Sequence, residues 1–376
     1  MSSFYIHIPF CKQACHYCDF HFSTSLKKKD EMIQALAQEI VMRKNEVEDE
    51  IETIYFGGGT PSVLSAAEIN FLIDVVYQNY KVIENPEITL EANPDDLYLE
   101  KIQEFARSKI NRLSIGVQSF FEDDLKIMNR AHNANQAKTC LEEATKYFDN
   151  ISIDLIYGIP NMSNEKWIQN IEIALSFDIP HISSYALTVE PKTALFKLIE
   201  KGEIEKPKDE VAENHFFLLI EKLKDNGFIH YELSNFGKEG FFSKNNTSYW
   251  LGKKYIGIGP SAHSYNTTHR SWNIANNSIY IKEIQKGNFP NEVEELSFSD
   301  RYNEYVMTGL RTMWGISLER IKNDFGQQYY DYLLQNSEKL ISNHLLEITE
   351  QTIKVTQKGK FLSDGIASEL FFISEL

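Results

Sequence analysis

Short β-rich runs alternate with segments of helical periodicity through the first 236 residues of the chain. The β-rich runs are Phe4–Ile8, Thr53–Phe56, Glu87–Glu91, Arg112–Gln118, Ile151–Tyr157, His181–Leu187 and Phe228–Leu233. Strands that alternate with helices are typical of right-handed βαβ units, which build a parallel sheet. About six such units favour an α/β fold of the incomplete (β/α)6, TIM-like barrel type, although spacing alone leaves a doubly wound sheet open.

Two connecting segments carry clear helical signals. Apolar residues in Asp30–Val47 recur on one helical face, which predicts a helix over that range. Ser65 and Glu68 have the spacing of a capping box, which predicts that the next helix begins there.

The pattern changes after Phe236. Residues 237–296 are rich in Gly, Asn and Ser and are predicted to be loops that connect and pack on a barrel domain of residues 1–236. From residue 297 to 376 we expect a winged-helix-like α+β module. Its predicted elements are the helices Arg301–Met313, Leu318–Asp324 and Gln327–Ser337, the strands Leu345–Ile348 and Ile353–Thr356, and a last helix near Phe361–Leu370.

Charge excludes one class of partner. The chain has 38 basic and 54 acidic residues, a formal net charge of −16, and residues 297–376 hold 8 basic and 11 acidic side chains. This balance repels phosphate backbones, so nucleic acid is not an expected partner even for a winged-helix-like module. The sequence shows neither a signal peptide nor an apolar stretch long enough to cross a membrane, so a cytoplasmic location is expected.

The four cysteines are unevenly spaced along the chain, and this pattern does not indicate a disulfide framework. Cys11, Cys15 and Cys18 form a CxxxCxxC motif directly after the first predicted strand, whereas Cys140 stands alone in a helical stretch and is expected to be a core residue. Clustered thiolates select zinc, copper(I) or iron–sulfur, and three ligands on a [4Fe–4S] cube leave one iron open. Two alternatives stay open: inert core cysteines, and a zinc site completed by His7, His16 or His21.

Further candidate residues follow the predicted strands. The glycines of Gly57–Pro61 let backbone N–H groups approach a carboxylate or phosphate, but a tight turn needs the same residues. Glu91, Gln118 and Asp154 lie in or at the ends of apolar strands, where parallel barrels place their active sites, although each is also able to cap a helix. Arg130 is a weaker candidate, since a surface salt bridge explains it equally well.

Several motifs together resemble those of the radical S-adenosylmethionine (SAM) superfamily, and within it the oxygen-independent coproporphyrinogen III oxidase-like family. The matching stretches, besides the CxxxCxxC motif, are Tyr5-Ile-His-Ile-Pro-Phe-Cys11, Phe56-Gly-Gly-Gly-Thr-Pro61, Glu91-Ala-Asn-Pro94, Ser114-Ile-Gly-Val-Gln118-Ser-Phe, Asp154-Leu-Ile-Tyr-Gly-Ile-Pro160, Tyr185-Ala186-Leu and Gly257-Ile-Gly-Pro-Ser-Ala-His263-Ser. The resemblance implies that Cys11, Cys15 and Cys18 bind a [4Fe–4S] cluster whose open iron chelates SAM. It also implies SAM contacts from Tyr5, Tyr17, Gly58, Gly59, Thr60, Glu91, Gln118, Arg130, Asp154 and Ala186.

The sequence departs from the oxidase pattern in two features. In both it resembles the sister branch of the family, the haem chaperones called HemW. Phe20 stands where the oxidase has a fourth cysteine, and the first strand begins only at Phe4, without the longer N-terminal segment of the oxidase. The resemblance therefore implies a protein that binds haem as cargo and delivers it to a haemoprotein. An electron donor such as a flavodoxin or ferredoxin and a homodimer are further expectations.

Two other hypotheses about the function stay open in addition to the haem chaperone. The alternatives are an oxygen-independent coproporphyrinogen III oxidase and a zinc-stabilised binding module without redox chemistry, and whether the chain catalyses a reaction is undecided. The chaperone branch often carries His-Asn-x-x-Tyr-Trp, but here the histidine is replaced by Asn245. If that histidine binds haem in the family, this chain needs another ligand, and His263, His230 and His132 cannot be ranked from sequence.

Overall fold

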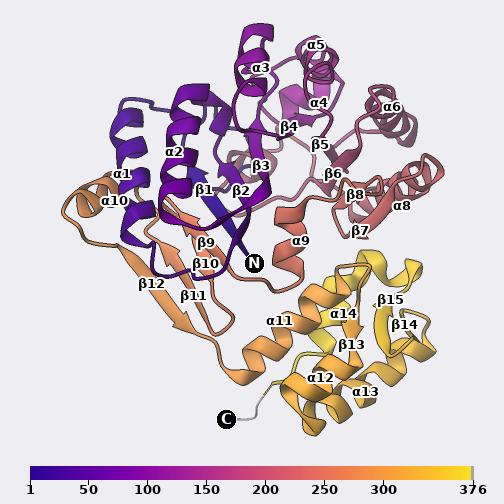
Figure 1. The fold of residues 1–376 in the computed structure, drawn as a ribbon. Coiled ribbons are helices and arrows are strands. Elements are labelled where there is room, and N and C mark those ends of the chain that lie inside the picture. The colour runs from indigo at the N-terminus through magenta and orange to yellow at the C-terminus, as the bar shows by residue number, and fades with distance from the viewer. Residues whose placement is uncertain (374–376) are drawn as a thin grey trace.

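The structure, a computed structural model, describes residues 1–373 and is built on a 12-stranded sheet (Figure 1). Six of its strands follow one another in chain order as parallel neighbours. They are β1 (Ser2–Ile8), β2 (Ile51–Gly58), β3 (Val82–Ala92), β4 (Arg112–Gln118), β5 (Ile151–Tyr157) and β6 (His181–Ala186). The sheet ends at β12 (Asn291–Glu295) and β7 (Ile229–Glu232), which do not pair with each other, so the predicted incomplete (β/α)6 barrel is confirmed.

Helices connect these strands and cover the outside of the curved sheet in Figure 1. They are α1 (Lys29–Met42), α2 (Ala66–Asn79), α3 (Leu99–Ala106), α4 (Glu122–Ile127), α5 (Ala134–Ala144), α6 (Asn164–Leu175), α7 (Ala194–Glu200) and α8 (Asp209–Asp225), with a 3-10 turn at Pro61–Val63. The capping box at Ser65 is confirmed, because the Glu68 N–H donates to Ser65 Oγ and the Ser65 N–H donates to Glu68 Oε2.

Alternation along the strands separates an apolar layer from a polar interior. On β1, Phe4, Ile6 and Ile8 are buried in the main hydrophobic core, while Tyr5 and His7 between them point to the opposite face. The apolar face of the sheet packs against the helices. The barrel interior is therefore left for polar side chains, and it is there that a site can form.

The prediction that 237–296 is loop is wrong, because this region continues the sheet. It begins at the last residue of β8 (Asn235–Gly237) and contains α9 (Lys244–Trp250), β9 (Tyr255–Ile258), β10 (His263–Tyr265), β11 (His269–Asn273), α10 (Asn277–Gln285) and β12 (Asn291–Glu295). Strand β9 pairs parallel to β1, and β10–β12 follow it as antiparallel neighbours. At Gly257 an added Cβ would lie 2.1 Å from the His263 carbonyl oxygen, so this glycine permits close strand packing and does not mark a loop.

Two further boundaries differ from the predictions. The predicted strand Phe228–Leu233 is found as β7 (Ile229–Glu232), but it pairs antiparallel with β8 and is no part of the parallel series. Helix α1 ends at Met42, short of Val47, because Arg43 turns inward and donates to Glu39 Oε1 and to the Gly257 carbonyl oxygen.

The C-terminal part forms its own hydrophobic core around a three-stranded sheet, as the winged-helix-like prediction requires. Its elements are α11 (Phe298–Leu310), β13 (Ile316–Ser317), α12 (Leu318–Phe325), α13 (Gln327–Ser342), β14 (Leu346–Thr349), β15 (Thr352–Val355), a 3-10 turn (Gln357–Leu362) and α14 (Ser363–Glu369). Residues 374–376 of the predicted module lie outside the described residues. This C-terminal module lies beside α9 and the orange strands of the sheet in Figure 1. No helix in residues 1–373 is long and apolar enough to span a membrane.

Candidate cysteine-lined active site

One cavity of about 490 Å³ gathers most of the predicted site residues at the carboxyl ends of the parallel strands. Its lining includes Cys11, Cys15, Tyr17, Cys18, Gly58, Gly59, Thr60, Glu91, Gln118, Arg130, Asp154 and Ala186. These residues come from loops and strands spread from residue 11 to residue 186 of the sequence. We call this site the cysteine-lined cavity.

The glycine turn after β2 holds the cysteine loop against the sheet. The Gly59 N–H donates to the Ile8 carbonyl at 2.9 Å, and the Thr60 N–H donates to the Phe10 carbonyl at 2.7 Å. A Cβ on Gly59 would lie 2.6 Å from the Phe10 carbonyl oxygen, so a side chain at this position would push the loop away. The turn thus positions Cys11, whose Sγ accepts a hydrogen bond of 3.5 Å from Thr60 Oγ1.

Arg130 is part of the site and not a surface salt bridge. Its Nη1 lies 3.3 Å from Cys15 Sγ and 3.4 Å from the Tyr17 hydroxyl, while Nη2 donates to Asn93 Oδ1 and to the Gly116 carbonyl, both at 2.7 Å. The guanidinium therefore joins the cysteine loop to β3 and β4.

Two partly buried carboxylates, Glu91 and Asp154, form the polar floor of the cavity. Burial raises the pKa of Glu91 to about 7, although a hydrogen bond of 2.8 Å from the Tyr55 hydroxyl opposes the shift. Burial likewise raises the pKa of Asp154 to about 6, against the opposing charges of Arg112 and Arg130. A cationic ligand would restore the ionised form of both groups, so the floor favours a positively charged molecule.

Gln118 supplies a free acceptor. Its backbone is in the left-handed region, with φ of 66°, and its side-chain Oε1 is buried with no hydrogen-bond partner among the described residues. A buried amide oxygen without a partner costs free energy, which a hydrogen-bond donor on a ligand in this cavity would recover.

Tyr5 does not line the cavity. It lies within β1, where its hydroxyl is 3.2 Å from His7 Nδ1 and its ring stacks near Tyr55 with centroids 6.1 Å apart. Its predicted contact with SAM stays a prediction.

The histidines of the zinc alternative do not join the cysteines. His7, His16 and His21 are absent from the cavity lining, and each has a ring nitrogen close to the oxygen of another residue. His7 Nε2 lies 2.9 Å from the His21 carbonyl oxygen, and His16 Nδ1 lies 2.9 Å from the Ile127 carbonyl oxygen. His21 Nε2 lies 2.7 Å from Asn277 Oδ1. Within residues 1–373 no three His, Cys, Asp or Glu side chains are gathered closely enough to hold a single ion.

Sequence reasoning missed Asn93, Arg112 and Tyr185. Asn93 donates to Thr60 Oγ1 at 3.2 Å and accepts from Arg130, while Tyr185 lines the cavity beside Asp154. Arg112 is buried and opposes the raised pKa of both floor carboxylates. The missed signal is the period of two along a strand: Asn93 lies two positions after Glu91, and Arg112 lies six positions before Gln118.

The candidate haem ligands lie elsewhere. Asn245, where the family often has histidine, is buried at the start of α9, and its Oδ1 accepts from Thr53 Oγ1 at 2.9 Å. His132 Nε2 is 3.0 Å from the Val117 carbonyl, and His230 stacks on Phe236 with its Nε2 3.1 Å from the Leu233 carbonyl. Of the three histidines, His263 alone is exposed.

Comparisons with known proteins agree along the whole chain. A model of the radical SAM superfamily matches residues 5–174, and a model of the HemN C-terminal domain matches residues 296–362. The chain is 34% identical to the heme chaperone HemW of Bacillus subtilis over 381 residues, which cover 100% of both chains. It is 34% identical to the heme chaperone HemW of Lactococcus lactis over 377 residues, covering 100% of this chain and 98% of the relative.

A solved structure shows the same fold. The coproporphyrinogen III oxidase HemN of Escherichia coli, a radical SAM enzyme, superposes with a TM-score of 0.85 over 98% of this chain and 89% of its own. The identity is 23%, so this likeness concerns the architecture alone.

Proposed function

The chain belongs to the HemW family of the radical SAM superfamily, and from that membership we propose that it is a haem chaperone that binds haem and delivers it to recipient haemoproteins. The observation that carries the proposal is the cysteine-lined cavity, in a chain whose whole length matches curated haem chaperones. The residue that would be a fourth cysteine in the oxidase is Phe20, an exposed aromatic residue at the rim of this cavity.

The residues of the cavity fit a [4Fe–4S] cluster and SAM, which the superfamily implies. Cys11, Cys15 and Cys18 would hold the cluster through their thiolates, and the partnerless Oε1 of Gln118 is an acceptor for a SAM donor group. When bound and reduced, a cluster of this kind supplies the electron that cleaves the sulfonium carbon–sulfur bond of SAM.

The chain's own groups would orient the cofactor. Glu91 and Asp154 provide negative charge for the sulfonium and ammonium groups and acceptors for the ribose hydroxyls. Arg130 fixes the cysteine loop through Cys15 and Tyr17, so the position of the cluster relative to β3 and β4 depends on it. The protein thus binds and shields, and the cofactors provide the redox chemistry.

The proposal includes three further features. An electron donor such as a flavodoxin or ferredoxin would reduce the cluster, and a homodimer is one possible assembly. The free thiols of the chain suit a reducing compartment, which supports a cytoplasmic location.

Haem titration tests the proposed function directly. The purified chain is expected to bind about one haem per chain, and anaerobic incubation with SAM, a reductant and coproporphyrinogen III is expected to give no decarboxylated product. Soret absorbance measures the first result and product chromatography the second. Conversion to protoporphyrinogen at enzyme-like rates would instead establish the oxidase alternative.

The floor carboxylates predict a pH dependence of SAM binding. Because Glu91 and Asp154 have pKa values of about 7 and about 6 without ligand, both are largely protonated in mild acid and ionised above neutrality. Binding of a cation requires both ionised forms, so SAM affinity is expected to fall about a hundredfold from about pH 8 to about pH 5.5. Equilibrium dialysis of the cluster-loaded protein measures it, and Glu91→Gln should flatten the upper part of the profile. A flat profile for the native chain would contradict this assignment.

A further inference from the structure

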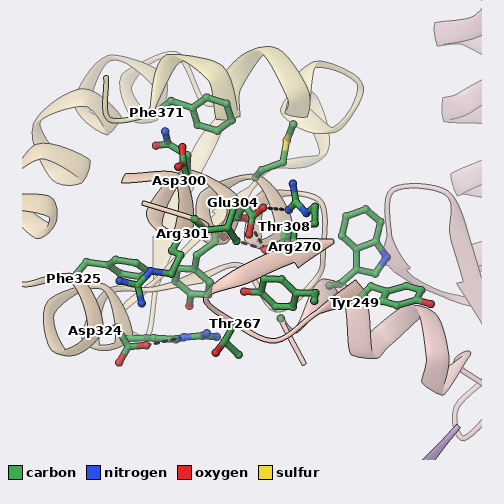
Figure 2. A pocket seen from close by; sticks show the side chains of 18 of the residues that line it. Tyr249, Thr267, Arg270, Asp300, Arg301, Glu304, Thr308, Asp324, Phe325 and Phe371 are labelled. Atoms are coloured by element: carbon green, nitrogen blue, oxygen red, sulfur yellow. Dashed lines mark hydrogen bonds and ion pairs between the residues drawn. The ribbon is translucent and has the colours of Figure 1, made fainter. Parts of the chain in front are cut away.

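A second cavity, of about 900 Å³, lies between the extended sheet and the C-terminal module (Figure 2). Tyr249 lies on the barrel side of it, whereas Asp300, Arg301, Glu304 and Phe371 lie on the side of the module. It is much larger than the cysteine-lined cavity, which the cluster and SAM would share. A bulky ligand therefore has a separate place to bind in this chain.

Flat aromatic side chains line the barrel side of this second cavity, here called the tyrosine-lined cavity. The rings of Tyr249 and Tyr255 meet edge to face with centroids 4.7 Å apart, and Tyr255 stacks on Tyr265 at 5.9 Å. Tyr255 and Tyr265 are cross-strand partners on β9 and β10, so the sheet itself sets this spacing. Such a surface suits a planar, largely apolar molecule.

Arginines from both sides of the cavity suit carboxylates. Arg270 pairs with Glu304, and Arg320 Nε donates to Asp324 Oδ2 at 3.1 Å in an exposed pair. Arg301 has no carboxylate partner within residues 1–373, and its Nε is buried without a hydrogen bond. The remaining acids that line the cavity are Glu294 and Asp300, and Asp300 already accepts from the Ser297 N–H at 2.9 Å as the helix cap.

Tyr265 is the lining tyrosine best placed to bind a metal centre. None of the described residues that line this cavity is a histidine. The Tyr305 hydroxyl already accepts from the Ser317 N–H at 2.9 Å, whereas no hydrogen bond of the Tyr265 hydroxyl is found within residues 1–373. Burial raises the pKa of Tyr265, and the charges of Arg270, Arg320 and Arg301 offset this rise only in part, so the free side chain is a neutral phenol until a ferric iron displaces its proton.

We propose that the tyrosine-lined cavity is the haem site, with the Tyr265 phenolate as an iron ligand and Arg301 and Arg320 as partners of the two propionates. Tyrosinate is an established ligand of ferric haem, and arginine is suited to carboxylates. As the iron–oxygen bond forms, the phenol proton leaves to solvent. This inference rests on the proposed function and explains how haem binds without the histidine that Asn245 replaces.

The test is ferric haem titration of the full chain and four variants. Tyr265→Phe is expected to lose the phenolate–iron bands in resonance Raman spectra and to raise the Kd at least about tenfold, and Arg301→Gln to raise it about tenfold. The controls are Tyr98→Phe and Arg107→Gln, two exposed residues near α3, which are expected to bind as the native chain does. Circular dichroism and thermal unfolding of each variant show whether it is folded.

The outcomes separate the site from the function. Loss of the phenolate bands in folded Tyr265→Phe, with normal spectra in both controls, supports the assignment. Unchanged spectra and affinity in both Tyr265→Phe and Arg301→Gln would overturn this site while leaving the chaperone proposal in place. No haem binding by the native chain would overturn the chaperone proposal itself.

Discussion

Single replacement of Cys11, Cys15 or Cys18 by alanine is expected to abolish assembly of the [4Fe–4S] cluster. All three cysteines line one cavity, and a cube that lacks one of only three protein thiolates keeps two ligands. Anaerobic reconstitution followed by iron and sulfide analysis measures the effect. The native chain should hold about four iron and four labile sulfide atoms, and each variant close to none.

Cys140→Ala is the matched control for this experiment. Cys140 is buried in α5, does not line the cysteine-lined cavity, and burial raises the pKa of its thiol well above the ordinary range. Its variant should therefore assemble the native amount of cluster. Bound zinc without labile sulfide in the native chain, or full cluster content in any of the three variants, would contradict the iron–sulfur assignment.

The same three variants separate cargo binding from cluster chemistry. The tyrosine-lined cavity and the cysteine-lined cavity share no lining residue. Haem binding should accordingly persist when the cluster is lost. A parallel loss of both would indicate that haem and cluster depend on one site.

The parallel strands were readily predicted from sequence because their signal is local. Arg112–Gln118 and Ile151–Tyr157 are confirmed to the residue as β4 and β5, since short runs rich in isoleucine, leucine and valine between turns are typical of strands. Parallel barrels place their active sites at the ends of the strands, which predicted that Glu91, Gln118 and Asp154 belong to one site. All three line the same cavity.

The strands beyond Phe236 were missed because their signal depends on the folded neighbours. Gly257 is a turn-like residue by composition, but it is required in β9 because the His263 backbone crosses close to it. Arg130 was similarly ambiguous, since nothing near it in sequence shows that Cys15, 115 positions away, is its partner. Contacts between distant segments decide both cases.

A buried network joins this missed extension to the barrel. Glu39 on α1 is fully buried and accepts hydrogen bonds from Arg43 Nη1 at 3.0 Å, Asn273 Nδ2 at 2.8 Å, the Gly259 N–H at 2.8 Å and the Tyr280 hydroxyl at 2.5 Å. Its partners therefore come from α1, from α10, from β11 and from the turn after β9. One carboxylate holds four elements that the hydrophobic pattern does not connect.

Glu39→Ala is expected to lower the free energy of unfolding by about 3–5 kcal/mol, because it removes a carboxylate that compensates the buried Arg43 charge and leaves the Gly259 N–H and the Tyr280 hydroxyl without an acceptor. Chemical denaturation followed by circular dichroism measures the loss. Glu46→Ala is the matched control, since Glu46 pairs with the same arginine at 2.8 Å but is half exposed, and its removal should cost less than about 1 kcal/mol. Equal losses in the two variants would show that burial of the Glu39 network is not what fixes β9–β11 to α1, and that apolar packing beside β1 is sufficient.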